Sequence, residues 1–370
     1  MRITTLAATA ALLAGLGAGI GAGTATAREL TYGTHIPSSH VTVENALTPF
    51  FNAAAANSKG EVKFVPHYAG AVAQHKTVLT AARDGLIDVG FVTDLYAPQE
   101  LPTSNLFSSL AAYGDDSRVM SGAINEMQLL NCPNCKKDVA AFDLVLLNVQ
   151  SLPAQYVMCK PKVASAADIK GKRVRATGPW ARMIATWGGV PVNLPITDTY
   201  EALERGQIDC AMGNIPFLKA YSLWDVAKNV LDVPLGAYFG AATVANAKVW
   251  TSLPPAARMA VEDLFPQYVA DTTYAYYDEE ASVRAEAQTR GVTFVPPSAD
   301  MKEAVAKAKA SARDDALTQA KRRKVEDAEA QVDAFLALVK KWEGIVAKAG
   351  TDRAAYRDAL KTEVFAKVAR

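Results

Sequence analysis

One arginine at the end of a short strand is the residue in this sequence best suited to binding chemistry. Arg175 ends a predicted strand over residues 172–175, and a turn over residues 176–178 follows it. A guanidinium presents a planar fork of donors that matches both oxygens of a carboxylate, which a lysine cannot do. We interpret Arg175 as the residue that captures an organic anion. The alternative is an arginine that forms a structural ion pair within its sheet.

The elements around Arg175 form a small α/β unit over residues 168–214, with strand, turn, helix, strand, helix and strand in that order. Two tryptophans lie seven residues apart on the helix that follows the turn, and both could be core residues. Trp180 is closer to the turn than Trp187, so it is the better candidate for a wall of the ligand site.

The start of the chain predicts a second α/β unit. Strands are expected over residues 29–35, 61–67 and 85–92, with helices over 40–56 and 74–84 between them. This order predicts a parallel sheet, which binds ligands at the carboxyl ends of its strands. The candidate ligand-facing residues of this unit are Thr34, His35, Gln74, Thr93, Asp94 and Tyr96.

Two apolar segments are expected to cross between these units. Residues 142–160 read as strands that leave the first lobe, and a return is expected near residues 235–247. Crossing strands make a hinge, so two lobes could close on one cleft. A long helix is expected over residues 256–289, and helical cover over 300–370. We assign residues 28–150 and 240–279 to the first lobe, and 151–239 and 280–370 to the second.

Charge and the N-terminus limit the cellular setting. With 39 basic and 38 acidic residues, the net charge of +1 provides no field for nucleic acid or membrane surfaces. Residues 1–27 combine Arg2, an uncharged apolar run and Ala25-Thr26-Ala27, which predicts a cleaved signal peptide and a periplasmic protein without membrane insertion. An N-terminal membrane helix is the alternative.

The four cysteines are interpreted in that oxidising setting. A disulfide between Cys132 and Cys135 is favoured, because a zinc site would need a second pair of ligands nearby. Cys159 and Cys210 each lie in a predicted strand. The sequence leaves open whether they pair or remain buried thiols.

Catalytic signatures are absent from the sequence. It contains no Gly-x-Ser-x-Gly elbow, no His-Glu-x-x-His and no glycine-rich phosphate loop. The histidines at 35, 40, 67 and 75 do not have the spacing of a standard metal pair. We therefore expect no catalytic residue, metal or cofactor, and an exported enzyme acting on an organic acid is the weaker hypothesis.

Several of these segments match a known family. The motifs are Asp168-x-Lys170-Gly171 before Arg175, Tyr200-x-Ala202-Leu203, Gly206-x-Ile208-Asp209, Gly85-x-Ile87-Asp88 and Trp250-x-x-Leu253-Pro254. With them, the chain resembles the periplasmic solute-binding subunits of TRAP transporters, the DctP-type family, over roughly residues 29–297.

The resemblance implies a fold and a function. The fold would be an α/β, two-lobed, type II-like periplasmic binding protein, in which each lobe has a central mixed sheet flanked by helices and a long helix bridges both. Such a protein closes on an organic acid and delivers it to the small and large membrane subunits of a TRAP permease. A sensory binding protein of a signalling system is an alternative with the same fold.

The resemblance also assigns site residues. Arg175 would form the salt bridge to the ligand carboxylate, and Asn214 and Gln74 match positions that line the site. Dicarboxylate and sialic-acid binders of the family usually have a second arginine about twenty residues earlier, where this sequence has Gln155. An amide neutralises a second carboxylate less well than a cation does, so a monocarboxylate ligand is expected.

Overall fold

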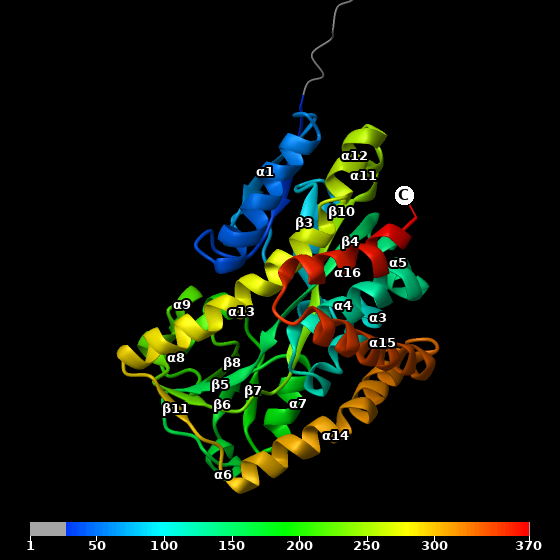
Figure 1. The fold of residues 1–370 in the computed structure, drawn as a ribbon. Coiled ribbons are helices and arrows are strands. Elements are labelled where there is room, and N and C mark those ends of the chain that lie inside the picture. Colours follow the sequence, from blue (N-terminus) through cyan, green and yellow to red (C-terminus); the bar gives the residue numbers. More distant parts are fainter. Residues whose placement is uncertain (1–26, 370) are drawn as a thin grey trace, which may run out of the picture.

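Two β-sheets lie next to each other in the computed structural model, which describes residues 27–369 (Figure 1). The first sheet has the strand order β2-β1-β3-β10-β4. β1, β2 and β3 are parallel, and β10 runs antiparallel to both of its neighbours. Its strands are β1 (Arg28–Gly33), β2 (Val62–His67), β3 (Val89–Thr93), β4 (Leu144–Ala154) and β10 (Ala237–Asn246).

The second sheet has the order β11-β9-β5-β8-β6-β7 and is also mixed, because β5 is antiparallel to both β8 and β9. Its strands are β5 (Tyr156–Cys159), β6 (Arg173–Arg175), β7 (Val190–Val192), β8 (Cys210–Gly213), β9 (Asn229–Leu231) and β11 (Thr293–Val295). We call each sheet, with the helices packed on it, a lobe.

The helices of the first half of the chain are short. They are a π-helical turn (Val43–Leu47), α1 (Thr48–Asn57), α2 (Val78–Arg83), α3 (Pro102–Ser108), α4 (Ser117–Glu126) and α5 (Pro133–Ala140). Those of the second lobe are α6 (Ala166–Ile169), α7 (Gly178–Thr186), α8 (Thr199–Glu204), α9 (Phe217–Ala220) and α10 (Leu223–Val226); α11 (Ala247–Thr251) follows β10.

The chain passes between the sheets at two adjacent points. Gln155 alone separates β4 of the first sheet from β5 of the second, and residues 232–236 return the chain from β9 to β10. The two crossings are hydrogen-bonded to each other: Gln155 N donates to Gly236 O at 3.0 Å, and Leu235 N donates to Gln155 O at 2.9 Å. Gly236 has a φ of +96°, and a Cβ there would lie 2.0 Å from Ala111 O, so only glycine fits this crossing.

A third connection is helical, and it is not the single helix expected over residues 256–289. The segment forms α12 (Pro255–Glu262) and α13 (Phe265–Thr289). Pro266 has no N–H to donate to the carbonyl of Glu262, so the first helix ends before it and the second begins with Pro266 in its first turn. α13 runs from contacts with β4 to contacts with β11 and so spans both lobes.

The last three α-helices of the described chain are α14 (Ala299–Arg322), α15 (Ala328–Ala349) and α16 (Arg353–Glu363), and a 3₁₀ turn (Phe365–Lys367) follows them. α14 contacts α6 of the second lobe and also α3, while α15 packs on α4 and α16 on α13 (Figure 1). Our placement of all of residues 280–370 with the second lobe was therefore wrong for α15 and α16. Amphipathic helices show that a face is buried but not which partner covers it.

The contact between α15 and α4 is close. A Cβ on Gly122 would lie 2.1 Å from the ring of Trp342, so the indole packs directly on the glycine backbone. The Trp342 Nε1 donates to Glu126 Oε2 at 2.8 Å, and Lys341 Nζ lies 2.8 Å from Glu126 Oε1. The tail is thus part of the core of the first lobe.

Two disulfides are present. Cys132 is bonded to Cys135, as favoured from the sequence, and Cys159 is bonded to Cys210. The second pair joins directly opposed residues of the antiparallel strands β5 and β8. The predicted signal peptide lies outside the described residues except for Ala27. Between residues 27 and 369, no helix has the length and apolar composition needed to cross a bilayer.

Candidate functional site

A cavity of about 70 Å³ lies where the carboxyl ends of strands from both sheets meet. Thr93 ends β3 of the first sheet and Arg175 ends β6 of the second, and both line it. Seven of its lining residues are aromatic: Phe91, Tyr96, Trp180, Phe217, Tyr221, Tyr238 and Tyr276. The site therefore lies at the strand ends that open α/β sheets use for ligands.

Arg175 is buried in this cavity and is held by neutral acceptors. Its Nε donates to Leu194 O at 3.0 Å, Nη1 to Met212 O at 2.9 Å and Nη2 to the Tyr96 hydroxyl at 2.7 Å. Among the described residues, no carboxylate is within ion-pair distance of it. One N–H on Nη1 and one on Nη2 remain for a further acceptor. A buried cation without a counter-ion is costly, so the arrangement favours an anionic ligand.

The bond from Arg175 to Tyr96 joins the two lobes across the cavity. Arg175 belongs to β6 of the second sheet, whereas Tyr96 ends a 3₁₀ turn (Asp94–Tyr96) that follows β3 of the first. An anion bound to the guanidinium would therefore be in contact with both sides of the cleft.

Histidines form part of the wall without adding charge. The rings of His35 and His75 stack with centroids 3.7 Å apart, and the His75 ring meets Tyr96 edge-on at 4.7 Å. Burial lowers the pKa of His75 to about 4, with a further contribution from the Arg175 charge, and burial lowers that of His40 to about 3. Burial also lowers the pKa of His35. These imidazoles are neutral at pH 7, which leaves Arg175 as the charged side chain of the lining.

These histidines predict acid sensitivity. An imidazole that stays neutral in the folded protein but takes up a proton when unfolded makes unfolding easier as pH falls below about 6.5. His40 should contribute a slope of about 1.4 kcal/mol per pH unit down to its folded pKa of about 3. Urea unfolding of wild type and His40→Gln at pH 7, 6 and 5 measures this. The variant should lose less stability on acidification, and equal slopes would contradict the assignment.

Three other residues expected at the site line the cavity together with Arg175, Tyr96 and His35. They are Thr93, Gln155 and Trp180. The Trp180 Nε1 is already bonded to Leu235 O at 2.8 Å, and Gln155 Nε2 donates to Pro153 O at 3.1 Å. Trp180 therefore presents its apolar ring to the cavity while its polar edge is bonded to the crossing segment.

Three expected site residues, Thr34, Gln74 and Asn214, lie outside the lining. Thr34 is buried, and its Oγ1 accepts from Ile36 N at 3.1 Å. Gln74 is exposed and outside the lining, and the next residue, His75, is the one buried against His35 and Tyr96. Asn214 is fully buried behind the cavity, where its Oδ1 accepts from Phe217 N at 3.3 Å. The shift at Gln74 arises because α2 begins at Val78, so residues 74–77 form a turn instead of the expected helix start.

Asp94 was also a candidate. It does not line the cavity, but it is hydrogen-bonded to Tyr238, which does. Its carboxylate accepts from Ser108 Oγ at 2.6 Å and from the Tyr238 hydroxyl at 2.9 Å, and burial raises its pKa to about 7. Gly240 packs against it, since a Cβ there would lie 2.3 Å from Asp94 Oδ1. Asp94 thus fixes Tyr238 and the turn that carries Tyr96.

Sequence reasoning missed the tyrosines contributed by distant elements. Tyr221 follows α9, Tyr238 lies in β10, and Tyr276 is on α13. His40 meets Tyr276 edge-on, with ring centroids 5.4 Å apart. No motif in the sequence indicated that these tyrosines share a cavity.

Comparison with known proteins decides the family. The family described as DctP, bacterial extracellular solute-binding protein family 7, matches residues 32–320. The chain belongs to this family. Members of the DctP family are non-enzymatic solute receptors of TRAP transport, so the predicted family is confirmed and the enzyme hypothesis is rejected.

Solved structures with the DctP fold are similar over most of the chain. An extracytoplasmic solute receptor of Bordetella pertussis that binds pyroglutamic acid has a TM-score of 0.73 at 19% identity, covering 84% of this chain and 100% of that one. A TRAP solute-binding protein of Bordetella bronchiseptica with bound mandelate has a TM-score of 0.74 at 21% identity, covering 85% of this chain and 99% of that one. A third, from Rhodoferax ferrireducens with copurified benzoate, has a TM-score of 0.76 at 19% identity, covering 86% of this chain and 99% of that one. The predicted two-lobed α/β fold is confirmed.

Proposed function

We propose that this DctP-family protein lies in the periplasm and captures a small organic monocarboxylate in the cavity between its lobes. It would then deliver this ligand to the membrane subunits of a TRAP permease. The observation that supports this most directly is the buried Arg175. Its guanidinium has only neutral partners and retains one free donor on each terminal nitrogen. A carboxylate bridging those two donors would supply the missing negative charge.

A single carboxylate fits the charges of the lining. Gln155 occupies the place where a second arginine would be expected, and its amide nitrogen is bonded to Pro153 O. The imidazoles of His35 and His40 are neutral because burial lowers the pKa of each. A second carboxylate would have to lose its hydration without gaining a cation, which is strongly unfavourable.

The rest of the ligand should be compact and largely apolar or cyclic. The cavity of about 70 Å³ is small, and Trp180, Tyr221 and Tyr276 provide aromatic walls. Rings pack well on such walls, and a tyrosine hydroxyl can bond a polar substituent. The acids named with the similar structures, pyroglutamate, mandelate and benzoate, each carry one carboxylate on a cyclic body. They are therefore suitable first ligands to test.

A matched ligand pair tests the charge argument. Benzoate and terephthalate share a ring, but terephthalate has a second carboxylate. Saturating benzoate or mandelate is expected to raise the melting temperature by several degrees, because a ligand at about 100 times its Kd adds about 2.7 kcal/mol. Terephthalate should produce no shift. A larger shift with dicarboxylates than with monocarboxylates would show that the inference from Gln155 is wrong.

A further inference from the structure

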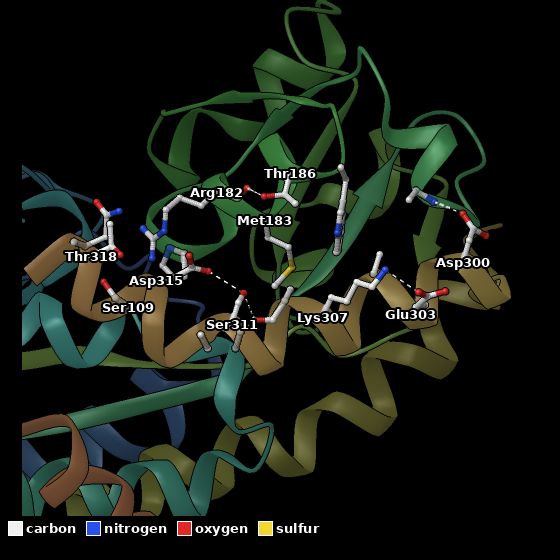
Figure 2. A pocket seen from close by; sticks show the side chains of 18 of the residues that line it. Ser109, Arg182, Met183, Thr186, Asp300, Glu303, Lys307, Ser311, Asp315 and Thr318 are labelled. Atoms are coloured by element: carbon white, nitrogen blue, oxygen red, sulfur yellow. Dashed lines mark hydrogen bonds and ion pairs between the residues drawn. The ribbon is translucent and has the colours of Figure 1, made fainter. Parts of the chain in front are cut away.

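A separate groove lies between α7 and α14. It has a volume of about 890 Å³ and is lined by side chains of α6, α7 and α14 and of the segments after α3 and α6. Figure 2 shows Arg182 extending from α7 toward α14, where its guanidinium lies near Asp315. No residue of α14 lines the cavity of Arg175, so the two sites are separate.

Arg182 lacks the partners that a buried guanidinium needs. Its Nε and Nη2 are buried, and neither has a hydrogen-bond partner among the described residues. Burial lowers the pKa of Arg182 to about 10. A buried donor left unsatisfied is costly, and an acceptor bound in the groove would satisfy these two.

The nearby cations increase this requirement. Arg322 lines the same groove from the last turn of α14, and its charge and that of Arg323 both act to lower the pKa of Arg182. Nη1 of Arg323 is itself buried without a partner in the described chain. Two guanidiniums, Arg182 and Arg322, therefore line one groove, and the charge of Arg323 acts on it from nearby.

The acids that line the groove bond to other groups. Glu303 pairs with Lys307 at 2.7 Å, and Asp300 accepts from Ser298 Oγ at 2.5 Å. Asp315 accepts from Ser311 Oγ at 3.0 Å and is the acid whose charge acts on Arg182. None of the three is within ion-pair distance of Arg182 in the described structure, so no ion pair satisfies its donors.

We propose that the groove between α7 and α14 binds a small oxyanion of the phosphate or sulfate kind, held between Arg182 and Arg322. The oxygens of such an anion accept several hydrogen bonds at once, and a guanidinium fork matches two of them. Because Nε and Nη2 of Arg182 are buried, its terminal torsions would have to turn for these donors to reach the anion. The bound anion would connect α7 of the second lobe to the last turn of α14. Helix α14 also contacts α3 of the first lobe.

Calorimetric titration of the purified protein with inorganic phosphate, at constant chloride, tests this site. One saturable site is expected, and Arg182→Gln and Arg322→Gln should each weaken it about tenfold or more. Asp315→Asn should tighten binding, because it removes a negative charge beside the anion. Arg205→Gln is the control. Arg205 follows α8 directly, is exposed and pairs with Glu201, so this variant should bind phosphate as wild type does.

A further variant separates this site from the carboxylate cavity. Arg175→Met should still bind phosphate with the wild-type affinity, even though it loses carboxylate binding. Repeating the titration with sulfate and with acetate distinguishes a tetrahedral oxyanion from a general carboxylate site, and sulfate should bind while acetate should not. The proposal is overturned if wild type gives no saturable phosphate signal, if Arg182→Gln binds as wild type does, or if Arg175→Met abolishes phosphate binding.

Discussion

Replacement of Arg175 by methionine is expected to abolish the rise in melting temperature that a monocarboxylate ligand produces, while the protein remains folded. The guanidinium supplies the charge and both remaining donors for the carboxylate. Two hydrogen bonds to a charged group are worth about 3 kcal/mol or more together, so affinity should fall by about two orders of magnitude at least. Thermal-shift and calorimetric titrations with benzoate and mandelate measure the loss.

Two comparisons make that result interpretable. Circular dichroism should show an unchanged fold, because methionine fills a similar volume and removes a buried cation that has no counter-ion. Arg175→Lys should lie between wild type and Arg175→Met, since lysine keeps the charge but loses the planar fork. Wild-type affinity in Arg175→Met would contradict the assignment of the site, whatever the outcome at the α7–α14 groove.

Removal of the Cys159–Cys210 disulfide is expected to lower the free energy of unfolding more than removal of the Cys132–Cys135 disulfide does. The bond joins β5 to β8 across a sequence separation of 51 residues. In the chain-entropy account, a loop of that length lowers the entropy of the unfolded state enough to stabilise the fold by about 4 kcal/mol. Urea unfolding of the Cys159→Ala/Cys210→Ala double variant measures the difference.

The other disulfide is the matched control. Cys132 and Cys135 are three residues apart, so the same account gives only about 2 kcal/mol for this bond. The Cys132→Ala/Cys135→Ala variant should therefore be the more stable of the two double variants. Equal losses would show that loop length does not determine the effect, and that local packing around each bond does.

The fold was largely predictable because its determinants are local. Alternating and continuous apolar runs marked the strands of the first sheet, and the family motifs identified the α/β unit around Arg175. The position of α15 was not predictable in this way. Its periodic apolar face includes Trp342, but only the structure shows that this ring packs on Gly122 of α4.

The lining of the cavity was predictable where its residues end or follow strands and not where it depends on packing between distant elements. Arg175, Thr93 and Tyr96 follow or end strands whose order could be read from the sequence. Tyr276 reaches the cavity only because α13 spans both lobes, a relation that no local pattern contains. Gln74 lies outside the lining, because the turn before α2 exposes it and buries His75 against His35 and Tyr96 instead.

The order of strands in the first sheet also constrains how the molecule can fold as it is made. β3 has β1 on one side, but its other neighbour, β10, does not begin until Ala237. The tail helix that packs on α4 comes later still, after Ala328. Until those segments are available, β3 has an unpaired edge and α4 lacks its cover. A growing chain therefore cannot complete its first lobe before nearly all of its length has emerged, and the two lobes must form almost together.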